Sequence, residues 1–481
     1  MTKTKITLPI IAFLLLISVI FLSGCGCKKP GPSYQVSLEV WGLFDDSDVM
    51  TKAINEYKDK NPRVREINYK KLLVNSYEND LVEALAAGKG PDVFLIHNTW
   101  LPKHQNKLAP APQDIINLKR VHDEFVDVVS QDFIADEEVY ALPRSVDSLA
   151  LYYNKNLLNQ AGLTHPPRTW QEFDDAVKKI TKIDSFGNII VSGAAMGASS
   201  DSSAGEGKIN RATDILTLLM MQAGAEMNDP ESGEATFAQL PESSGIGKLS
   251  PGVSALVYYT KFSNLSNEEY CWNSFMHNSV DSFIEGKTAM MINYSWLIPK
   301  IQSRAPKLSF GVAPIPQNKD EEGRGLDVNF ANYWGFAVSK NKFRDAQAGS
   351  DVQASKIKPA SNEERITEAW RFIKFLTMTG YNQESVQGKE TNSNYDPAFE
   401  YIESQKKPAA RRDLIEKQKD DILISPFAEG NLIAKSWRQP DNLAVEKIFD
   451  EMIDDIVLRN EDPQRVVRQA QSSVNVLMKK E

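Results

Sequence analysis

Strand-like and helix-like hydrophobic patterns alternate along the first part of the chain. Apolar runs typical of buried strands cover residues 36–41, 65–69 and 93–96, and apolar residues at helical spacing cover 50–57 and 77–85. This β-α-β-α-β order predicts a parallel sheet with helices on its faces. In such a sheet, ligands bind beyond the carboxyl ends of the strands.

The length of 481 residues is too great for one small core and favours two large lobes or domains. Hydrophobic residues make up 42% of the chain and charged residues 25%, which is ordinary for a globular protein. The formal net charge of -9 and the lack of a basic stripe argue against nucleic-acid binding. With only 3 cysteines, no disulfide framework is expected.

The N-terminus has the pattern of an export signal. Lys3 and Lys5 precede a nearly unbroken apolar run over residues 8–22, which is short for a bilayer span. The run ends in Leu-Ser-Gly-Cys at 22–25, which resembles the lipobox of bacterial lipoproteins. That resemblance implies a signal peptide over 1–24, lipidation of Cys25, and a location at the extracytoplasmic face of the cell membrane.

Residues 25–35 would then be a tether between the lipid and the folded protein. Two alternatives stay open for this terminus. One is a plain transmembrane anchor, and the other is an ordinary signal peptide with a chance cysteine.

Residues 140–173 contain the most specific local pattern. An extended segment ends at Pro143, an apolar strand follows over 148–153, a short helix stops at Gly162, and a new helix begins after Thr169. This block resembles the bacterial extracellular solute-binding proteins of the sugar-binding type (family 1), which include the maltose-binding protein. The matching residues are Tyr140, Leu142, Pro143, Tyr153, Asn154, Lys155, Leu157, Ala161, Gly162, Pro166, Pro167, Thr169, Trp170 and Glu172.

Further segments resemble the same family in the same order along the chain. They are 86–96 (AAGKGPDVFLI), 283–291 (FIEGKTAMM), 334–339 (WGFAVS) and 407–414 (KPAARRDL). The resemblance implies an α/β fold of the two-lobe periplasmic-binding-protein type (type II-like). Each lobe would be a mainly parallel sheet flanked by helices, with a hinge between the lobes.

The same resemblance sets the expected division of the chain. The first lobe would comprise residues 36–146 and 340–415, and the second lobe residues 149–334 and 416–481. The hinge segments are expected near 145–149, near 334–339 and at about 415.

Two kinds of group recognise sugars. Aromatic rings pack against the C–H faces, and charged or amide groups bond to the hydroxyls. The loops expected around the cleft carry this mixture. The candidate ligand-binding residues are Trp41, His97, Asn98, Thr99, Trp100, Arg144, Asp147, Asn293, Tyr294, Trp296, Tyr333, Trp334 and Trp437.

Three of these candidates match ligand-contact positions of the family by motif: Asp147, Trp296 and Trp437. The turn at 97–100 matches a ligand-contacting turn in place but not in residue type. A tryptophan near a strand end is also often a packed core residue. Asp45 and Asp46 have the pattern of a turn or helix-cap pair, with ligand contact the minority interpretation.

The predicted function is a lipid-anchored solute receptor that captures a carbohydrate and delivers it to the subunits of an ABC permease. It would act as a monomer and without a cofactor. No metal site is expected because the 5 histidines lack a metal-binding pattern, and no enzymatic activity is expected because no nucleophile or phosphate motif is present. The alternatives are a glycoside-acting hydrolase, a binder of another solute (polyol phosphate, polyamine or ferric ion), and a sensor lipoprotein that does not serve transport.

Overall fold

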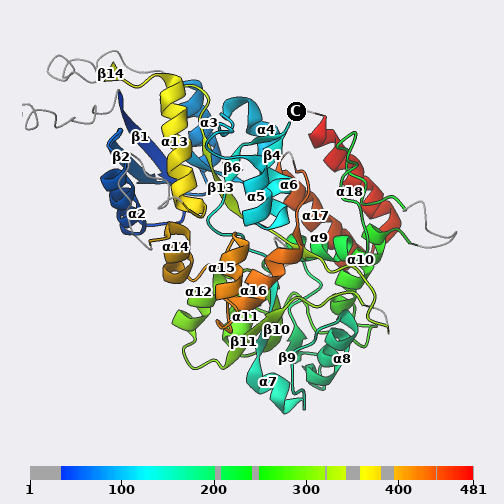
Figure 1. Ribbon diagram of the computed structural model, residues 1–481. Coiled ribbons are helices and arrows are strands. Elements are labelled where there is room, and N and C mark those ends of the chain that lie inside the picture. Colours follow the sequence, from blue (N-terminus) through cyan, green and yellow to red (C-terminus); the bar gives the residue numbers. More distant parts are fainter. Residues whose placement is uncertain are drawn as a thin grey trace, which may run out of the picture.

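A computed structural model describes residues 34–200, 207–240, 249–319, 322–342, 358–380, 395–439 and 441–479. The expected signal peptide and Cys25 lie outside the described residues. Figure 1 shows two lobes, with β1, β2 and α13 in one and β10, β11 and α8 in the other. Within the described ranges, no helix is long and apolar enough to cross a membrane.

The first lobe is built on a mixed sheet in which β1 pairs in parallel with β2, β3 and β14, whereas β13 runs antiparallel to β3 and β6. Helix α13 packs on β1 and β13, and α2 packs on β2. The strands are β1 (Tyr34–Gly42), β2 (Val64–Lys71), β3 (Val93–His97), β6 (Ala141–Leu142), β13 (Trp334–Val338) and β14 (Lys358–Pro359). The helices are α2 (Ser47–Lys60), α3 (Tyr77–Ala86), α4 (Leu101–His104), α5 (Leu118–Glu124), α6 (Asp127–Phe133), α13 (Asn362–Thr377), α14 (Pro397–Gln405) and α15 (Arg412–Lys417). The short hairpin β4 (Ile134–Ala135) and β5 (Glu138–Val139) follows α6.

The second lobe has a sheet in the order β11-β7-β10-β9-β8. Its strands are β7 (Ala150–Asn154), β8 (Lys182–Ile183), β9 (Ile189–Ala194), β10 (Thr288–Asn293) and β11 (Phe310–Pro314). Its helices are α7 (Lys155–Gln160), α8 (Trp170–Ile180), α9 (Ala212–Gln222), α10 (Pro251–Thr260), α11 (Ser279–Ile284), α12 (Leu297–Arg304), α16 (Ser425–Gly430), α17 (Asn442–Val457) and α18 (Pro463–Met478).

The two-lobe α/β fold class is confirmed, but the second sheet is less parallel than the sequence predicts. In this sheet β9 and β10 pair in parallel, while β7 runs antiparallel to β10 and β11 and β8 runs antiparallel to β9. The reason is the direction of β7, which carries the chain away from the first lobe. Its neighbours run back, so that Asn293 at the end of β10 lies opposite Ala150 at the start of β7.

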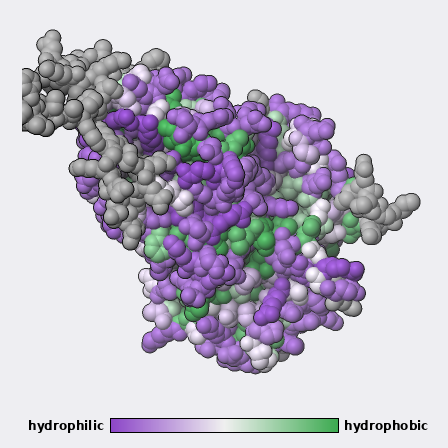
Figure 2. Space-filling model, viewed as in Figure 1, coloured by the Kyte–Doolittle hydropathy of each residue, from purple (hydrophilic) through white to green (hydrophobic). Residues whose placement is uncertain are grey.

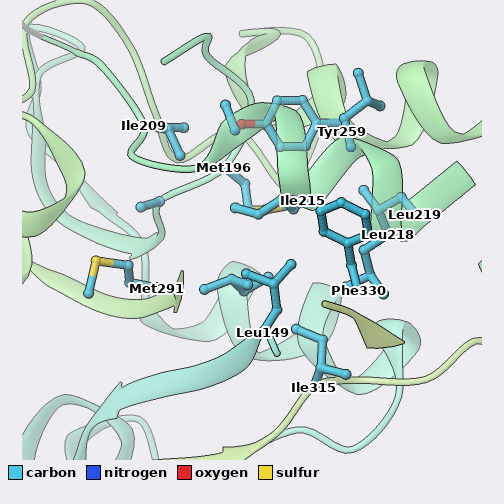
Figure 3. Packing of buried hydrophobic residues seen from close by; sticks show 14 of the residues in the cluster. Leu149, Met196, Ile209, Ile215, Leu218, Leu219, Tyr259, Met291, Ile315 and Phe330 are labelled. Carbon is cyan, nitrogen blue, oxygen red and sulfur yellow. The ribbon is translucent and has the colours of Figure 1, made fainter. Parts of the chain in front are cut away.

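Two separate hydrophobic clusters form the interior. The first cluster draws mainly on residues 34–146, 331–338 and 360–415, and the second mainly on residues 149–330 and 437–474. Figure 3 shows part of the second cluster, where Leu149, Ile215, Leu218 and Phe330 point toward one another. Burial of these apolar side chains is the main favourable term for each lobe, at roughly 25 cal/mol per Å² removed from water.

The chain changes cluster between Val146 and Leu149, and again between Phe330 and Ala331. These crossings lie side by side, because Ser148 forms an antiparallel bridge with Ala331. Strand β12 (Asn329–Phe330) also pairs in parallel with β15 (Ala434–Lys435). The segments that join the lobes are therefore hydrogen-bonded to one another.

The first crossing is also bonded to the segment that follows α14. Ser145 forms an antiparallel bridge with Ala409. The Asn431 Nδ2 donates to the carbonyl oxygens of Val146 and Ala409, at 2.7 and 3.1 Å. One amide side chain thus ties the first crossing to the segment that follows α14.

Candidate functional site: a cleft between the two lobes

A cavity of about 580 Å³ lies where the two hydrophobic clusters meet, and residues of both lobes line it. Figure 2 shows a largely hydrophilic outer face with hydrophobic residues gathered near its centre. The cavity takes its walls from the ends of β3, β10 and β13, from the first crossing, and from the first turn of α17. This is the edge of the sheets at which the sequence places a ligand.

Aromatic rings form much of the wall. Trp334 of β13 and Trp296 before α12 are both half-buried, so each keeps ring surface open to the cavity. Trp334 is held edge to face by Trp100 and His97, with ring centroids 5.0 and 5.1 Å away. Phe44, which is 51% exposed, extends the apolar surface toward the cavity mouth. Ring faces presented in this way suit the C–H faces of sugars.

Arg144 and Asp45 form a buried ion pair in the first-lobe wall. The Arg144 guanidinium lies 3.7 Å from the centre of the Tyr401 ring and 5.2 Å from that of Phe336. The sequence predicts a turn or helix-cap pair at Asp45 and Asp46, and Asp46 does stand at the N-cap position of α2 (Ser47–Lys60). Its side chain makes no cap bond and instead accepts from the Lys71 Nζ, whereas Asp45 is paired with Arg144.

Asp147 lies at the first crossing and is tied to the second lobe. Its Oδ1 accepts from the Ser295 backbone N–H at 3.1 Å, and its Oδ2 accepts from the Ser295 hydroxyl at 2.7 Å. Burial raises the pKa of Asp147 above its usual range, although Lys407 and the Ser295 bonds oppose that change. The carboxylate is fixed in position next to the cavity.

His97 ends β3 and is uncharged in the folded protein. Burial lowers its pKa to about 4, partly offset by the bond to Asn332. Its Nε2 lies 3.2 Å from the Asn332 Oδ1, and its Nδ1 lies 2.9 Å from the Thr99 hydroxyl oxygen. Because an amide oxygen only accepts, the proton resides on Nε2 and Nδ1 accepts from Thr99.

The cleft brings together the following candidates from the sequence: His97, Arg144, Asp147, Tyr294, Trp296, Tyr333 and Trp334. A neighbouring cavity of about 670 Å³ is lined by three others, Asn98, Thr99 and Trp437. Trp437 is only 4% exposed, and its ring stacks on that of Phe449 with centroids 5.9 Å apart.

The remaining candidates lie outside both cavities. Trp41 packs against the first cluster with the Lys70 Nζ 5.4 Å from its ring centre. Trp100 is buried and stacks on Tyr77 with centroids 6.1 Å apart. Asn293 is buried, and its amide donates to the Asn210 Oδ1.

Several residues of the cleft wall were not singled out from the sequence as ligand contacts. They are Phe44, Arg211, Asn332, Tyr401, Lys407, Asn442 and Glu446. Arg211 directly precedes α9, and Glu446 lies in the first turns of α17. Their local sequences resemble ordinary helix beginnings, so only the tertiary fold places them at the cavity.

Two lobes with a polar and aromatic cavity between them define a solute-binding protein. In the described residues, no group of histidine, cysteine, aspartate or glutamate side chains could hold a metal ion. The family model for bacterial extracellular solute-binding proteins matches residues 52–389. The chain belongs to this family, which is a family of extracytoplasmic binding proteins and not of enzymes.

Relatives of this chain include a binding protein of Brucella abortus, 23% identical over 317 residues that span 60% of this chain and 69% of the relative. The multiple sugar-binding protein of Streptococcus mutans is 22% identical, over 64% of this chain and 69% of the relative. Among solved structures, the cyclic alpha-maltosyl-1,6-maltose binding protein of Arthrobacter globiformis is similar with a TM-score of 0.66 at 17% identity. That alignment covers 93% of this chain and 100% of the other. This structural likeness shows a shared fold.

Proposed function

We propose that this protein is a lipid-anchored extracytoplasmic receptor that captures an uncharged carbohydrate between its lobes and delivers it to an ABC permease. The observation that carries this proposal is the presence of two half-buried tryptophans, Trp296 from the second lobe and Trp334 from the first, in one cavity that charged and amide side chains also line. The relatives of this chain include a multiple sugar-binding protein and a maltodextrin-binding protein, which supports the same ligand class.

The charges of the cavity favour an uncharged ligand. His97 is neutral, and where Asp147 and Glu446 are ionised, above their raised pKa values, the charged residues balance in number: Arg144, Arg211 and Lys407 against Asp45, Asp147 and Glu446. A polyol phosphate would need a surplus of cations, and a polyamine would need a surplus of carboxylates. Neither surplus is present in the described lining.

The ferric-ion alternative requires tyrosinates, and the cleft tyrosines are unsuited to that role. The Tyr294 hydroxyl donates to the Asp214 carboxylate, and the Tyr333 hydroxyl donates to the Asp132 carboxylate. Burial, with these neighbouring carboxylates, raises the pKa of both tyrosines well above the usual value. Both tyrosine hydroxyls therefore favour the protonated form, and a protonated phenol is a poor ligand for a hard cation.

Capture proceeds by hinge closure of two discontinuous lobes, one built mainly from residues 34–146, 331–338 and 360–415 and the other mainly from residues 149–330 and 437–474. The paired crossings at Ser148 and Ala331, and the bridge that holds Ser145 beside the first crossing to Ala409, support this mechanism. Hydrogen-bonded crossings concentrate the backbone rotation in a few residues and leave each hydrophobic cluster intact.

The anchor is a lipid on Cys25, and the permease receives the sugar from the closed form. A Cys25→Ala variant expressed in a bacterial host tests the anchor. The parent protein is expected in the membrane fraction and in the detergent phase, and the variant in the soluble fraction. Equal partitioning of the two proteins contradicts lipidation at Cys25.

Thermal unfolding of residues 28–481 with a panel of mono- and oligosaccharides tests the ligand class. A ligand present at 100 times its Kd stabilises the folded state by about 2.7 kcal/mol, which raises the unfolding temperature. Recovery of the intact sugar after incubation supports a receptor, whereas cleavage products indicate a hydrolase. A panel without any shift contradicts the carbohydrate assignment.

A further inference from the structure

Most polar side chains that line the cleft already have protein partners. Asp45 is paired with Arg144, and Asp147 accepts two bonds from Ser295. Asn442, at the start of α17, accepts from the Trp100 Nε1 at 3.4 Å. A sugar hydroxyl that bonds to one of these groups therefore bonds to a group that also bonds to the protein.

Arg211 and Glu446 differ from these residues. Among the described residues, the Arg211 side chain forms no hydrogen bond, and its nearest carboxylate contact is the Asp214 Oδ2, 3.9 Å from Nη1. Its Nε is buried and has no partner in the part of the chain that the structure describes. The Glu446 carboxylate likewise has no hydrogen bond or ion pair within the described part of the chain, although Glu446 lines the same cavity. A guanidinium with five N–H donors and a carboxylate acceptor are thus both open for bonding.

The backbone at Arg211 is also unusual. Its φ is 66°, in the left-handed region that residues with a side chain seldom adopt. Strain of this kind persists only where the surrounding structure enforces it, and it is frequent at ligand sites. Arg211 directly precedes α9 (Ala212–Gln222), and its backbone conformation sets the point from which its side chain extends.

Neighbouring contacts fix this position. The preceding residue, Asn210, receives a bond from the Asn293 amide at 2.9 Å, and its backbone N–H donates to the Ser279 hydroxyl at 2.9 Å. The Arg211 guanidinium lies 5.7 Å from the centre of the Tyr294 ring. Tyr294 is itself held by its bond to Asp214. The arginine is therefore pre-positioned while its donors stay open, which is the arrangement of a binding residue.

We propose that Arg211 and Glu446 form the hydroxyl-recognising pair of the second lobe and determine which sugar the protein selects. This inference rests on the proposed carbohydrate-binding function. The guanidinium donates to one hydroxyl oxygen, and the Glu446 carboxylate accepts from the same hydroxyl or from its neighbour. Because the pair carries one positive and one negative charge, it satisfies both the oxygen and the proton of an uncharged sugar.

The electrostatic surroundings of Glu446 are consistent with this role. Burial raises its pKa, Asp214 and Asp450 raise it further, and Arg211 lowers it. A sugar hydroxyl that donates to Glu446 favours the ionised carboxylate. Affinity is therefore expected to fall as the pH drops and Glu446 takes up a proton.

The test compares Arg211→Lys and Glu446→Gln with the parent protein by isothermal titration calorimetry. Arg211→Lys keeps the charge but removes the planar fork, and Glu446→Gln keeps the shape but removes the charge. The probes are maltotriose, mannotriose, arabinotriose and galactobiose, followed by monodeoxy analogues of each sugar that binds. Each variant is expected to weaken binding about 10- to 100-fold, because Arg211→Lys loses the fixed geometry of the guanidinium donors and Glu446→Gln loses a charge-assisted hydrogen bond.

The deoxy analogues separate recognition from a purely structural effect. The parent protein is expected to bind one analogue, the one that lacks the recognised hydroxyl, about 10-fold or more weakly than the full sugar. Glu446→Gln is expected to bind that analogue and the full sugar almost equally, and to lose the parent's pH dependence of affinity. Glu451→Gln, on the exposed face of the same helix, is the matched control and is expected to behave like the parent.

The possible outcomes are distinct. If both variants bind the sugar as tightly as the parent and distinguish it equally well from its deoxy analogue, the proposed role of Arg211 and Glu446 is contradicted. The carbohydrate-binding function is not affected by that result. Failure of the parent protein to bind any of the four sugars contradicts both proposals. If Arg211→Lys does not fold, the Glu446→Gln titrations with the deoxy analogues decide the matter alone.

Discussion

The indole rings of Trp100 and Trp334 meet edge to face, with centroids 5.0 Å apart and planes at 75°, yet only Trp334 lines the cleft. Trp100 is 7% exposed and also packs against Tyr77. The two neighbouring tryptophans are therefore expected to have different roles, one in binding and one in stability.

Replacing each ring in turn tests this division. Trp334→Leu is expected to weaken sugar binding about tenfold or more, since it removes a ring face in the cavity. Trp100→Leu is expected to destabilise the first lobe by about 2–4 kcal/mol with a smaller effect on affinity. Chemical denaturation and calorimetric titration measure the two quantities. Equal losses of affinity contradict the assignment of the binding face to Trp334.

A second pair, Trp296 and Trp437, separates binding from packing in the second lobe. Trp296 is half-buried at the cleft, whereas Trp437 stacks on Phe449 and its buried Nε1 has no partner among the described residues. Trp296→Ala is expected to reduce affinity with little loss of stability. Trp437→Ala is expected to cost about 3–5 kcal/mol of unfolding free energy, because it leaves a cavity.

Trp437→Phe is the matched control for this pair. It keeps a ring against Phe449 and removes only an indole nitrogen that bonds to nothing in the described residues. We expect it to cost much less stability than Trp437→Ala. A large loss of affinity in Trp437→Phe, with stability unchanged, instead assigns the ring to ligand contact, as the family resemblance implies.

Gly430 lies where the crossings between the lobes meet. A Cβ atom at this position would stand 2.5 Å from the Asn329 Nδ2 and 2.8 Å from the Ser148 Oγ. Neither group can withdraw freely, because Asn329 donates to the Leu149 carbonyl oxygen and Ser148 donates to the Phe427 carbonyl oxygen. Gly430→Ala is therefore expected to destabilise the protein by about 1–3 kcal/mol.

The double variant Ser148→Ala/Gly430→Ala checks the cause of this loss. Removing the Ser148 hydroxyl relieves one of the two close contacts, so the double variant is expected to be more stable than the sum of the single effects predicts. Urea denaturation of the three variants measures the coupling. Strict additivity indicates that Ser148 does not limit the space at Gly430.

The sequence predicts the fold because the relevant signals are local. The helical spacing of Met50, Ala53, Ile54 and Tyr57 gives the buried face of α2, whatever the rest of the chain does. Strand direction carries no such local signal. The antiparallel pairing of β7 with β10 depends on where the chain enters the second lobe, so the periodicity of β7 could not reveal it.

Among the candidates on or next to strand ends, His97 and Trp334 line the cleft, whereas Trp41 and Asn293 do not. The sequence analysis did not single out residues that reach the cleft from a helix beginning. Arg211 and Glu446 are remote from each other in sequence, and their approach is a property of how α9 packs against α17. No pattern within either segment distinguishes them from ordinary first-turn residues.

Asp132 provides a prediction about pH. It is a buried carboxyl on α6 that accepts from the Asn98 amide and from the hydroxyls of Tyr333 and Ser436. Burial raises its pKa from 3.8 to about 7, and the three hydrogen bonds only partly oppose this. Between these pH values the folded protein holds a proton on Asp132 that the unfolded chain releases.

Because the unfolded state binds fewer protons in this window, this group makes the free energy of unfolding fall as the pH rises from 3.8 to about 7. The full contribution is about 4 kcal/mol. An Asp132→Asn variant is neutral at every pH and lacks this slope. Its stability relative to the parent is therefore expected to rise between pH 4 and pH 8, by an amount that urea denaturation at both pH values measures.

Asp127→Asn on the same helix is the control for a general charge effect, since its side chain is 82% exposed. If the two variants change in parallel with pH, the slope belongs to the net charge of the protein and not to Asp132. If only Asp132→Asn departs from the parent, the buried carboxyl is the source. In that case the hydrogen bond from the Ser436 hydroxyl to Asp132 is stronger when the carboxyl is ionised. This bond joins α6 of the first lobe to the segment that leads into α17.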